Sequence, residues 1–403
     1  MHGPRATFIY LTVVFGLLVI PRALQRFRLP AQLTCFAFGI IVAGFFKPLI
    51  GDSVISYLST LGIASLFLFA GLEVDLAELR RQLPSLAGHF AVRGLVLVLC
   101  ARLAAVFFHL GWQVDWLVAL ALLTPSTGFI LDMLPHSGLD HIEQSEVALH
   151  AIAGEVTAVF LFLVISQAGS MKTLLVSGGA IILLIAFMPL VFLALGRYVV
   201  PYAPGSEFSL LLMVGLICAV ITETLGVYYL VGAFVAGLVA RSLNKRMTTL
   251  ASHENLEAIR LFASFFIPFY FFHNGLGVPS AALVASSLLY GLVLSVCVIP
   301  IRLGVVWLQS RFMQHRGHRG SFRVAIALTP TLIFTLVIAE LLRENFAVSP
   351  SLYGGLLVYA AVVWAAFFGF VLSYEEPKLR KTHGAEYQAY CARVPRWIPR
   401  IVL

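Results

Sequence analysis

One acidic residue of the sequence lies in the middle of a long apolar stretch. Glu155 stands within HAIAGEVTAVFLFLVI (150–165), whereas most other acidic residues fall near the ends of apolar segments or between them. An ionisable group inside a membrane is costly and is therefore a functional candidate by default. Burial favours the protonated carboxyl and a nearby cation favours the carboxylate, so one group can hold a proton in one state and a metal ion in another. The sequence thus predicts a single carboxylate for which a proton and a metal cation compete.

Arg302 is the basic residue that we expect to be the charge partner of Glu155. It lies within another apolar stretch, GLVLSVCVIPIRLGVV (291–306). In one interpretation, Arg302 stabilises the carboxylate of Glu155 only when no proton or cation is bound. The alternative is a permanent structural ion pair, which would leave Glu155 without a role in binding.

Two further segments place a proline between hydroxyl-bearing residues. They are Thr124-Pro125-Ser126 and Thr329-Pro330-Thr331. Proline donates no backbone hydrogen bond and obstructs the carbonyl one turn earlier, so it breaks a helix. Unwound carbonyls and hydroxyl groups can coordinate a cation, and for this role we predict Thr124, Ser126, Thr329 and Thr331. A simple proline kink is the alternative, but two breaks in matching positions favour coordination.

Composition indicates the kind of structure that must position these residues. Of 403 residues, 60% are hydrophobic and 11% charged. A soluble domain carries about a quarter charged residues, and disordered chains are poor in apolar ones. We therefore predict an all-α polytopic membrane protein. The net charge of +8 is attributed to cytoplasmic loops rather than to binding of nucleic acid, and the five cysteines include no close pair that would indicate zinc or disulfides.

Stretches long enough to cross a bilayer, about 20 apolar residues each, define the predicted transmembrane helices. Thirteen are found: 6–24, 30–50, 54–74, 84–108, 115–134, 146–168, 172–196, 206–225, 227–243, 256–275, 280–309, 321–342 and 350–373. With this count most lysines and arginines collect in loops on one side. The positive-inside rule then places the N-terminus outside and the C-terminus in the cytoplasm.

An internal repeat relates the two halves of the chain. GLVLVLCARLAAVF (94–107) is similar to the stretch around Arg302, and in each half the next predicted helix carries a Thr-Pro break. The matching helices lie seven apart, and an odd offset inverts the second copy in the membrane. We predict repeat 1 over 6–168, a linker helix over 172–196 and repeat 2 over 206–373. Inverted repeats with broken helices are typical of secondary transporters.

Several motifs resemble the monovalent cation:proton antiporter superfamily, in its branch of bacterial Na⁺/H⁺ and K⁺-efflux antiporters. FLFAGLEVDLAELRR, ETLGVYYLVGAFVAGLV and FFIPFYFFHNGLGV are similar to that family's F-x-x-G-L-E, E-x-x-G…G-A-F-x-A-G and P-x-F-F-x-x-x-G-L segments. The resemblance extends over about residues 5–373. It implies thirteen helices, two of them crossed and unwound, in a core that moves against a dimerisation domain.

The resemblance also implies an acidic pair at the position of Gly154-Glu155 and a basic residue at Arg302. In this sequence glycine replaces the first residue of the pair, and the second residue is a glutamate. Pro330-Thr331-Leu332 stands where the family often has Arg-Gly-Glu. A single carboxylate favours one-for-one, electroneutral exchange.

The tail, 374–403, has a resemblance of its own. EEPKLRKTHGAEYQAYCARVPRWIP (375–399) resembles the end of isoprenylcysteine and phospholipid methyltransferases. We interpret it as a cytoplasmic methyltransferase-like tail, or alternatively as an amphipathic helix on the bilayer surface. Methyltransferase chemistry that depends on Glu375 and Glu376 stays open as an alternative function.

Together these observations predict a secondary active transporter, not an enzyme, that exchanges Na⁺ or K⁺ for protons by alternating access. It is expected to need no cofactor, to form a homodimer and to lie in a bacterial cytoplasmic membrane. A second alternative is a transporter of the same fold that has lost cation/proton exchange.

Overall fold

The computed structural model describes residues 4–25, 29–74, 76–134, 139–167, 171–203, 205–224, 229–243, 252–313 and 317–370, together with Gly384. Throughout this part the chain is helical and contains no strand, which confirms the all-α prediction. The predicted methyltransferase-like tail, apart from Gly384, lies outside the described residues. So do residues 225–228 of the ETLGVYYLVGAFVAGLV motif and Asp75 of the FLFAGLEVDLAELRR motif.

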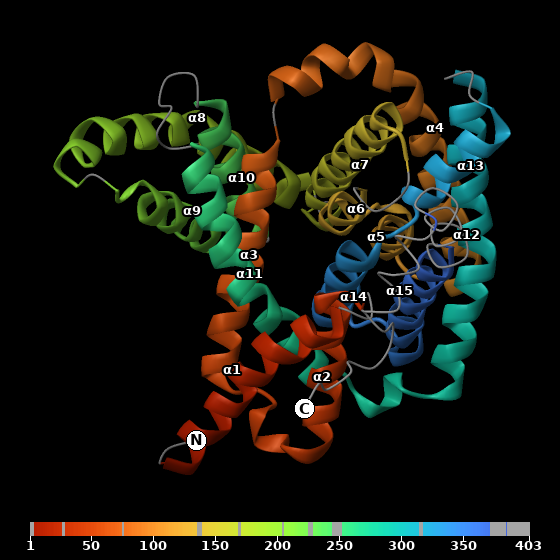
Figure 1. Ribbon diagram of the computed structural model, residues 1–403, viewed down its shortest axis with the longest axis horizontal. Coiled ribbons are helices and arrows are strands. Elements are labelled where there is room, and N and C mark those ends of the chain that lie inside the picture. Colours follow the sequence, from red (N-terminus) through yellow and green to blue (C-terminus); the bar gives the residue numbers. More distant parts are fainter. Residues whose placement is uncertain are drawn as a thin grey trace.

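The helices form two groups. In Figure 1, α3 and α8 to α11 lie on the left, α4 to α7 and α12 to α15 lie on the right, and α1 and α2 lie at the bottom. The scaffold group packs around α3 and α11, and the crossed-helix group packs around α5 and α12. The scaffold group consists of α1 (Pro4–Gln25), α2 (Ala31–Phe45), α3 (Ser53–Glu73), α8 (Met171–Tyr198), α9 (Glu207–Thr224), α10 (Tyr229–Ser242) and α11 (His253–Leu276). The crossed-helix group consists of α4 (Leu76–Phe108), α5 (Trp112–Leu123), α6 (Thr127–Met133), α7 (His141–Gln167), α12 (Ala285–Met313), α13 (His318–Ala327), α14 (Leu332–Phe346) and α15 (Pro350–Phe370). Short 3₁₀ turns occur at η1 (Lys47–Leu49), η3 (Val200–Tyr202) and η4 (Ser280–Ala282).

Each of the thirteen predicted segments overlaps one helix or, at 115–134 and 321–342, two helices separated by a break. Within the described residues, nine helices are long and apolar enough to cross a membrane, or ten if the bent pair α13 and α14 is one span. Helices α2, α5 and α10 are apolar but shorter. The polytopic architecture is therefore established, and the count of thirteen spans stays a prediction that depends on these three short helices.

Glycines allow the scaffold helices to pack with their backbones in contact. A Cβ atom on Gly71 of α3 would overlap the carbonyl oxygen of Phe234 in α10, and Gly237 of α10 meets α3 in the same way. Gly39 of α2 and Gly275 of α11 form a second such contact. Small residues that let helices approach closely are characteristic of packing inside membranes, where apolar burial alone does not drive association.

The start of α3 is fixed by a side-chain cap. Asp52 accepts hydrogen bonds from the backbone N–H groups of Val54 and Ile55, which have no partner within the helix. The hydroxyl of Tyr10 in α1 donates to the same carboxylate over 2.5 Å. The cap therefore also ties α1 to α3.

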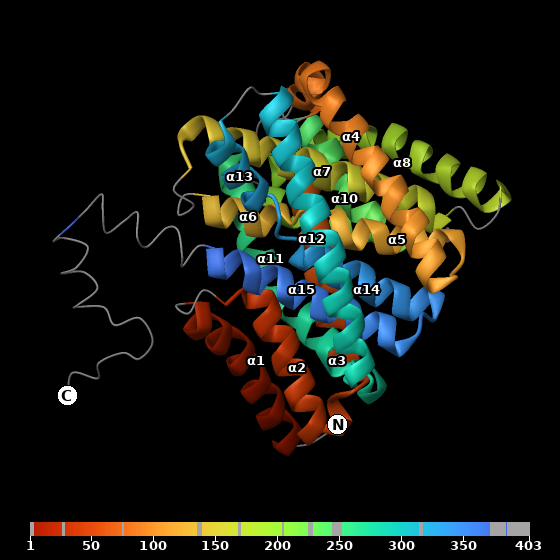
Figure 2. The same ribbon diagram turned by 90° about the vertical axis from the view of Figure 1, so that its right-hand side faces the viewer.

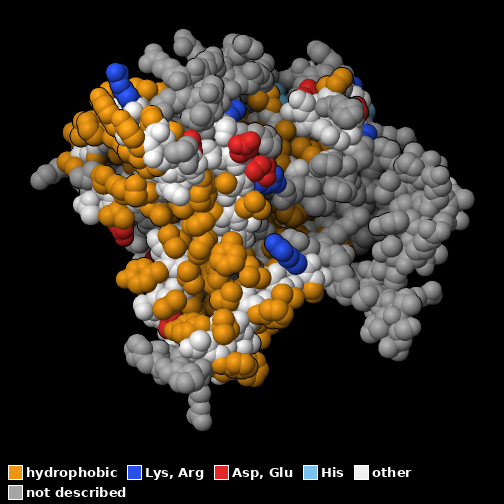
Figure 3. Space-filling view, turned by 60° about the vertical axis from the view of Figure 1, so that its left-hand side comes forward, with side chains coloured by type: hydrophobic (Ala, Val, Ile, Leu, Met, Phe, Trp, Pro, Cys, Tyr) orange, Lys and Arg blue, Asp and Glu red, His pale blue; other side chains and the backbone are white. Residues whose placement is uncertain are grey.

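The outer surface of the scaffold group is apolar. Hydrophobic side chains cover most of the described surface in Figure 3, with few charged side chains among them. Large exposed apolar residues on α8 and α9 include Ile182, Leu183, Phe187, Ile217 and Val220. An exposed apolar surface of this extent is what a protein that faces lipid requires.

Candidate functional site

The two Thr-Pro breaks lie against each other inside the crossed-helix group. The first separates α5 from α6, and the second separates α13 from α14 with a bend of 40°. The backbone N–H of Ser126 donates to the carbonyl of Pro330 across 2.8 Å. The broken helices are thus joined at their breaks. Because neither polar group has a partner within its own helix, each satisfies the other away from water.

Three carbonyls that the breaks release are already occupied by protein donors. The hydroxyl of Thr335 donates to Ala121 O over 2.7 Å, and the hydroxyl of Tyr359 donates to Leu122 O over 2.7 Å. The Leu328 carbonyl at the second break accepts from Arg302 at 3.1 Å. These bonds stabilise the unwound backbone, and they leave fewer carbonyls for a cation than the sequence alone suggested.

The four hydroxyl residues predicted as cation ligands fall into two matching pairs. Thr124 and Thr329 each donate to the carbonyl four residues earlier in their own helix, at 2.7 and 2.9 Å. Ser126 and Thr331 are buried, with 1% and 0% of their surfaces exposed, and their hydroxyls have no hydrogen-bond partner in the described structure. A buried polar group without a partner is uncommon and calls for an explanation. These two hydroxyls are therefore the better candidates for ligands.

Glu155 lies on α7 beside the first break. Its carboxylate Oε2 accepts a hydrogen bond from the backbone N–H of Thr127 over 2.6 Å. Because α6 begins at Thr127, that N–H has no carbonyl partner within its own helix. Glu155 is thus positioned at the break itself.

Glu155 and Thr127 both line a cavity of about 450 Å³ between the two helix groups. Residues of α3, α10 and α11 form its wall on the scaffold side, and α7 and α14 form the wall on the other side. Four residues add polar atoms to the wall on the scaffold side, namely Gln32, Glu73, Arg260 and Ser264. In the part of the chain that the structure describes, no group of three or more His, Cys, Asp or Glu side chains could hold a resident metal ion.

Sequence reasoning missed Thr127 and these four polar residues as parts of the site. Two of these residues could have been identified from features of the sequence. Thr127 directly follows the break at Ser126, and Glu73 ends the FLFAGLE stretch. Gln32 and Ser264 carry no such signal, because single polar residues in apolar helices are common.

The structure does not bring Arg302 to Glu155. The guanidinium of Arg302 donates to the Tyr359 hydroxyl at 3.3 Å and to Leu328 O at 3.1 Å. It lines a second cavity, of about 350 Å³, which shares no lining residue with the cavity of Glu155. In this conformation Arg302 supports the second break rather than the carboxylate.

A different arginine lies next to the site on α7. Arg93 of α4 donates to His150 O at 3.0 Å, and a Cβ atom on Gly154 would overlap its Nη1 atom. A Cβ there would also lie 3.1 Å from Cγ of Pro125. The guanidinium therefore occupies the space that a side chain at position 154 would take.

Two helices broken at matching positions, with a carboxylate at the break and a cavity between two helix groups, define a secondary transporter. Residues 10–374 match the family described as "Sodium/hydrogen exchanger, transmembrane", and the chain belongs to this family of transporters. It is therefore a transporter and not an enzyme, and transporters of this family need no cofactor.

Two proteins of Methanocaldococcus jannaschii are similar to the chain. A curated relative named "Probable Na(+)/H(+) antiporter 3" is 25% identical over 281 residues, which is 67% of this chain and 70% of that protein. The sodium proton antiporter MjNhaP1, whose structure was solved at pH 8, matches with a TM-score of 0.64 and 14% identity. That match covers 91% of this chain and 95% of the other, and it shows the same fold.

Proposed function

We propose that the chain exchanges a monovalent cation, Na⁺ or K⁺, for protons by alternating access, with Glu155 as the group that both ions share. Family membership and the printed names of the two relatives support Na⁺ as the first cation to test. In one state Glu155 holds a proton. In the other its carboxylate holds the cation, and the hydroxyls of Ser126 and Thr331 complete the set of oxygen ligands.

The observation that carries this proposal is the hydrogen bond from Thr127 N–H to Glu155 at the wall of the cavity between the groups. The cavity gives water and ions access to the carboxylate, and the two groups provide the parts that move relative to each other. Because a monovalent cation and a proton carry equal charge, their competition for one carboxylate exchanges them one for one.

The proposal extends to the surroundings of the chain. We place it in a bacterial cytoplasmic membrane as a homodimer, with the N-terminus outside and the C-terminus inside. The distribution of basic residues supports this orientation. The predicted inverted repeats, over 6–168 and 206–373, are supported by the two matching breaks. Arg302 acts on Glu155 in this scheme only in a conformation other than the one described here.

The test is transport by the purified full-length chain in proteoliposomes. Proton flux is followed with Na⁺, K⁺ and Li⁺ in turn, for the native chain and for Glu155→Gln. We expect cation-dependent proton flux in the native chain and none in the variant. Glu254→Gln, which changes an exposed acid in the first turn of α11, is the matched control and should transport normally. Unchanged flux in Glu155→Gln would refute the mechanism. A native chain without flux for any of these cations would instead favour a transporter that has lost the exchange.

A further inference from the structure

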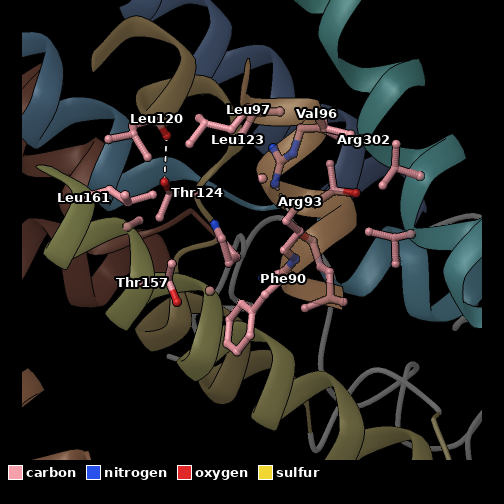
Figure 4. Close-up of a pocket in the computed structure, with 18 of the residues that line it drawn as sticks. Phe90, Arg93, Val96, Leu97, Leu120, Leu123, Thr124, Thr157, Leu161 and Arg302 are labelled. Atoms are coloured by element: carbon pink, nitrogen blue, oxygen red, sulfur yellow. Dashed lines mark hydrogen bonds between the residues drawn. The ribbon is translucent and has the colours of Figure 1, made fainter. Parts of the chain in front are cut away.

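The second cavity, of about 350 Å³, brings together two arginines from distant parts of the chain. Arg93 enters from α4 and Arg302 from α12, and both are labelled at the cavity in Figure 4. The cavity lies within the crossed-helix group, where α4, α7, α12 and α13 all supply lining residues and occupy the same part of the molecule in Figure 2. It is separate from the cavity of Glu155, because the two share no lining residue.

Among the described residues, nothing neutralises the positive charge of this cavity. None of the lining residues is acidic, and within this part of the chain both arginines bond to neutral groups, namely two backbone carbonyls and the Tyr359 hydroxyl. A guanidinium has five N–H donors, so most of the donors on the two side chains remain available. Two like charges in a low-dielectric site strongly favour an anion between them.

The hydroxyls in the cavity do not compete with the arginines as donors. Thr124, Thr157 and Thr329 each donate to the carbonyl four residues earlier in their own helix. The rest of the wall is apolar, with Phe90, Leu97, Leu120, Leu161, Val305 and Leu328 among its residues. The site therefore offers charge-assisted donors at one place and hydrophobic surface around it.

We propose that this cavity binds an amphipathic organic monoanion, with a carboxylate or phosphate head on Arg93 and Arg302 and an apolar body against the surrounding wall. Gly154 is part of this site, because the absence of a side chain at position 154 makes room for the Arg93 guanidinium. Such an anion could be a soluble carboxylate or the head of an anionic lipid, and both have the same chemistry at the arginines.

Binding is measured as a rise in the thermal unfolding temperature of the purified full-length chain in a non-ionic detergent. Octanoate is the soluble probe, and octanol, which has the same chain length without the charge, is its control. Phosphatidylglycerol and phosphatidylcholine are compared in the same way in mixed micelles. Stabilisation by octanoate alone identifies a soluble anion, and stabilisation by phosphatidylglycerol in competition with octanoate identifies a lipid head. Both outcomes support the site.

Substitutions in and near the cavity test whether octanoate binds there. Arg93→Gln and Arg302→Gln should each weaken octanoate binding by about tenfold or more, as expected for the loss of a charge-assisted hydrogen bond. Gly94→Leu fills the cavity from α4, and it should fold because a Cβ at Gly94 meets nothing within 4 Å. Gly304→Leu on α12 is the matched control, since its Cβ is equally free and Gly304 does not line the cavity.

Three results would overturn the proposal. The first is stabilisation by octanol as strong as that by octanoate. The second is no stabilisation by either octanoate or phosphatidylglycerol. The third is octanoate binding by Gly94→Leu as tight as that by the native chain. Because no transport is measured, these results leave the proposed exchange at Glu155 untouched. Conversely, a failure of exchange in proteoliposomes leaves the anion site standing.

Discussion

The backbone N–H of Ser126 donates to the carbonyl of Pro330 across 2.8 Å, so that each broken helix supplies a polar group that the other lacks. Neither break is a local kink that could be removed without effect on its counterpart. The cost of an unpaired backbone group inside a membrane, several kcal/mol, holds the two breaks together. The energetic importance of the surrounding hydrogen bonds can therefore be tested one residue at a time.

Loss of the Thr335 hydroxyl should destabilise the fold. Thr335→Val keeps the shape of the side chain but removes the 2.7 Å bond to Ala121 O, which is left buried and without that donor. We expect a loss of about 1–3 kcal/mol in the free energy of unfolding. Thermal unfolding in detergent measures this loss. Thr331→Val, whose hydroxyl has no partner in the described structure, is the control and should unfold close to the native temperature.

The same control variant should affect transport. If Ser126 and Thr331 coordinate the cation, Ser126→Ala and Thr331→Val raise the KM for Na⁺ in proteoliposomes while leaving the unfolding temperature nearly unchanged. Thr329→Val, whose hydroxyl is bonded within its own helix, should change the KM less. Equal KM values for all three variants would remove the two free hydroxyls from the proposed ligand set.

The sequence was sufficient to locate Glu155 and the two breaks. A carboxylate in an apolar run, and proline between hydroxyl residues, are local features whose physical consequences do not depend on the rest of the fold. The contact between the breaks and the bond from Thr127 to Glu155 depend on how the helices pack, and they are seen only in the structure.

The partners of the arginines could not be predicted in the same way. The position of Arg302 in an apolar stretch says that it must find polar partners, but it does not say which ones. In the structure neutral acceptors, Leu328 O and the Tyr359 hydroxyl, take its hydrogen bonds in place of a carboxylate. Arg93 lies within the predicted helix 84–108, and no neighbouring residue identifies its partner. Its place against Gly154 depends on the packing of α4 on α7, which no local pattern encodes.

A side chain at position 154 should displace Arg93. Gly154→Val would overlap the Arg93 guanidinium and crowd Pro125, so we expect it to destabilise the chain. Removing the obstructing side chain in Arg93→Ala should relieve part of this effect. A double-mutant cycle from unfolding temperatures is expected to give a coupling of about 0.5–3 kcal/mol, the range for residues in direct contact. Additive effects would mean that the two residues do not share this space in solution.

Exchange by one carboxylate should move no net charge. Proteoliposomes with a Na⁺ gradient and equal pH on both sides should acidify or alkalinise without an electrical current. Clamping the membrane potential with valinomycin and K⁺ should leave the initial rate of Na⁺-driven proton flux unchanged, provided that K⁺ is not itself a substrate. A transport current, or a rate that depends on the clamped potential, would contradict one-for-one exchange.

The cap at Asp52 predicts a pH-dependent contribution to stability. Partial burial alone raises the pKa of Asp52, but the hydrogen bonds from Tyr10, Ile55 and Val54 outweigh it and hold the pKa below its ordinary value of 3.8. A carboxylate whose pKa is lowered by folding stabilises the protein above that ordinary value, and this stabilisation is lost as the pH falls through the lower, folded-state pKa.

The comparison uses Asp52→Asn, which keeps a capping side chain that does not titrate, and Asp52→Ala, which removes the cap. At neutral pH the alanine variant should lose about 1 kcal/mol and the asparagine variant less. Between pH 5 and the acid limit of the folded protein, the native chain should approach the asparagine variant in stability. A constant difference between the two across this range would show that the carboxylate charge contributes nothing.

The glycine contacts between α2 and α11 and between α3 and α10 leave no room for these helices to slide past one another. They give this part of the molecule a fixed geometry, against which movement elsewhere can be measured. A spin label or fluorophore on the outer surface of α9 would keep a fixed position relative to α3, while a second label near Glu155 on α7 would report any displacement of the site. A change in the distance between the two labels during turnover measures how far the site moves relative to the scaffold group.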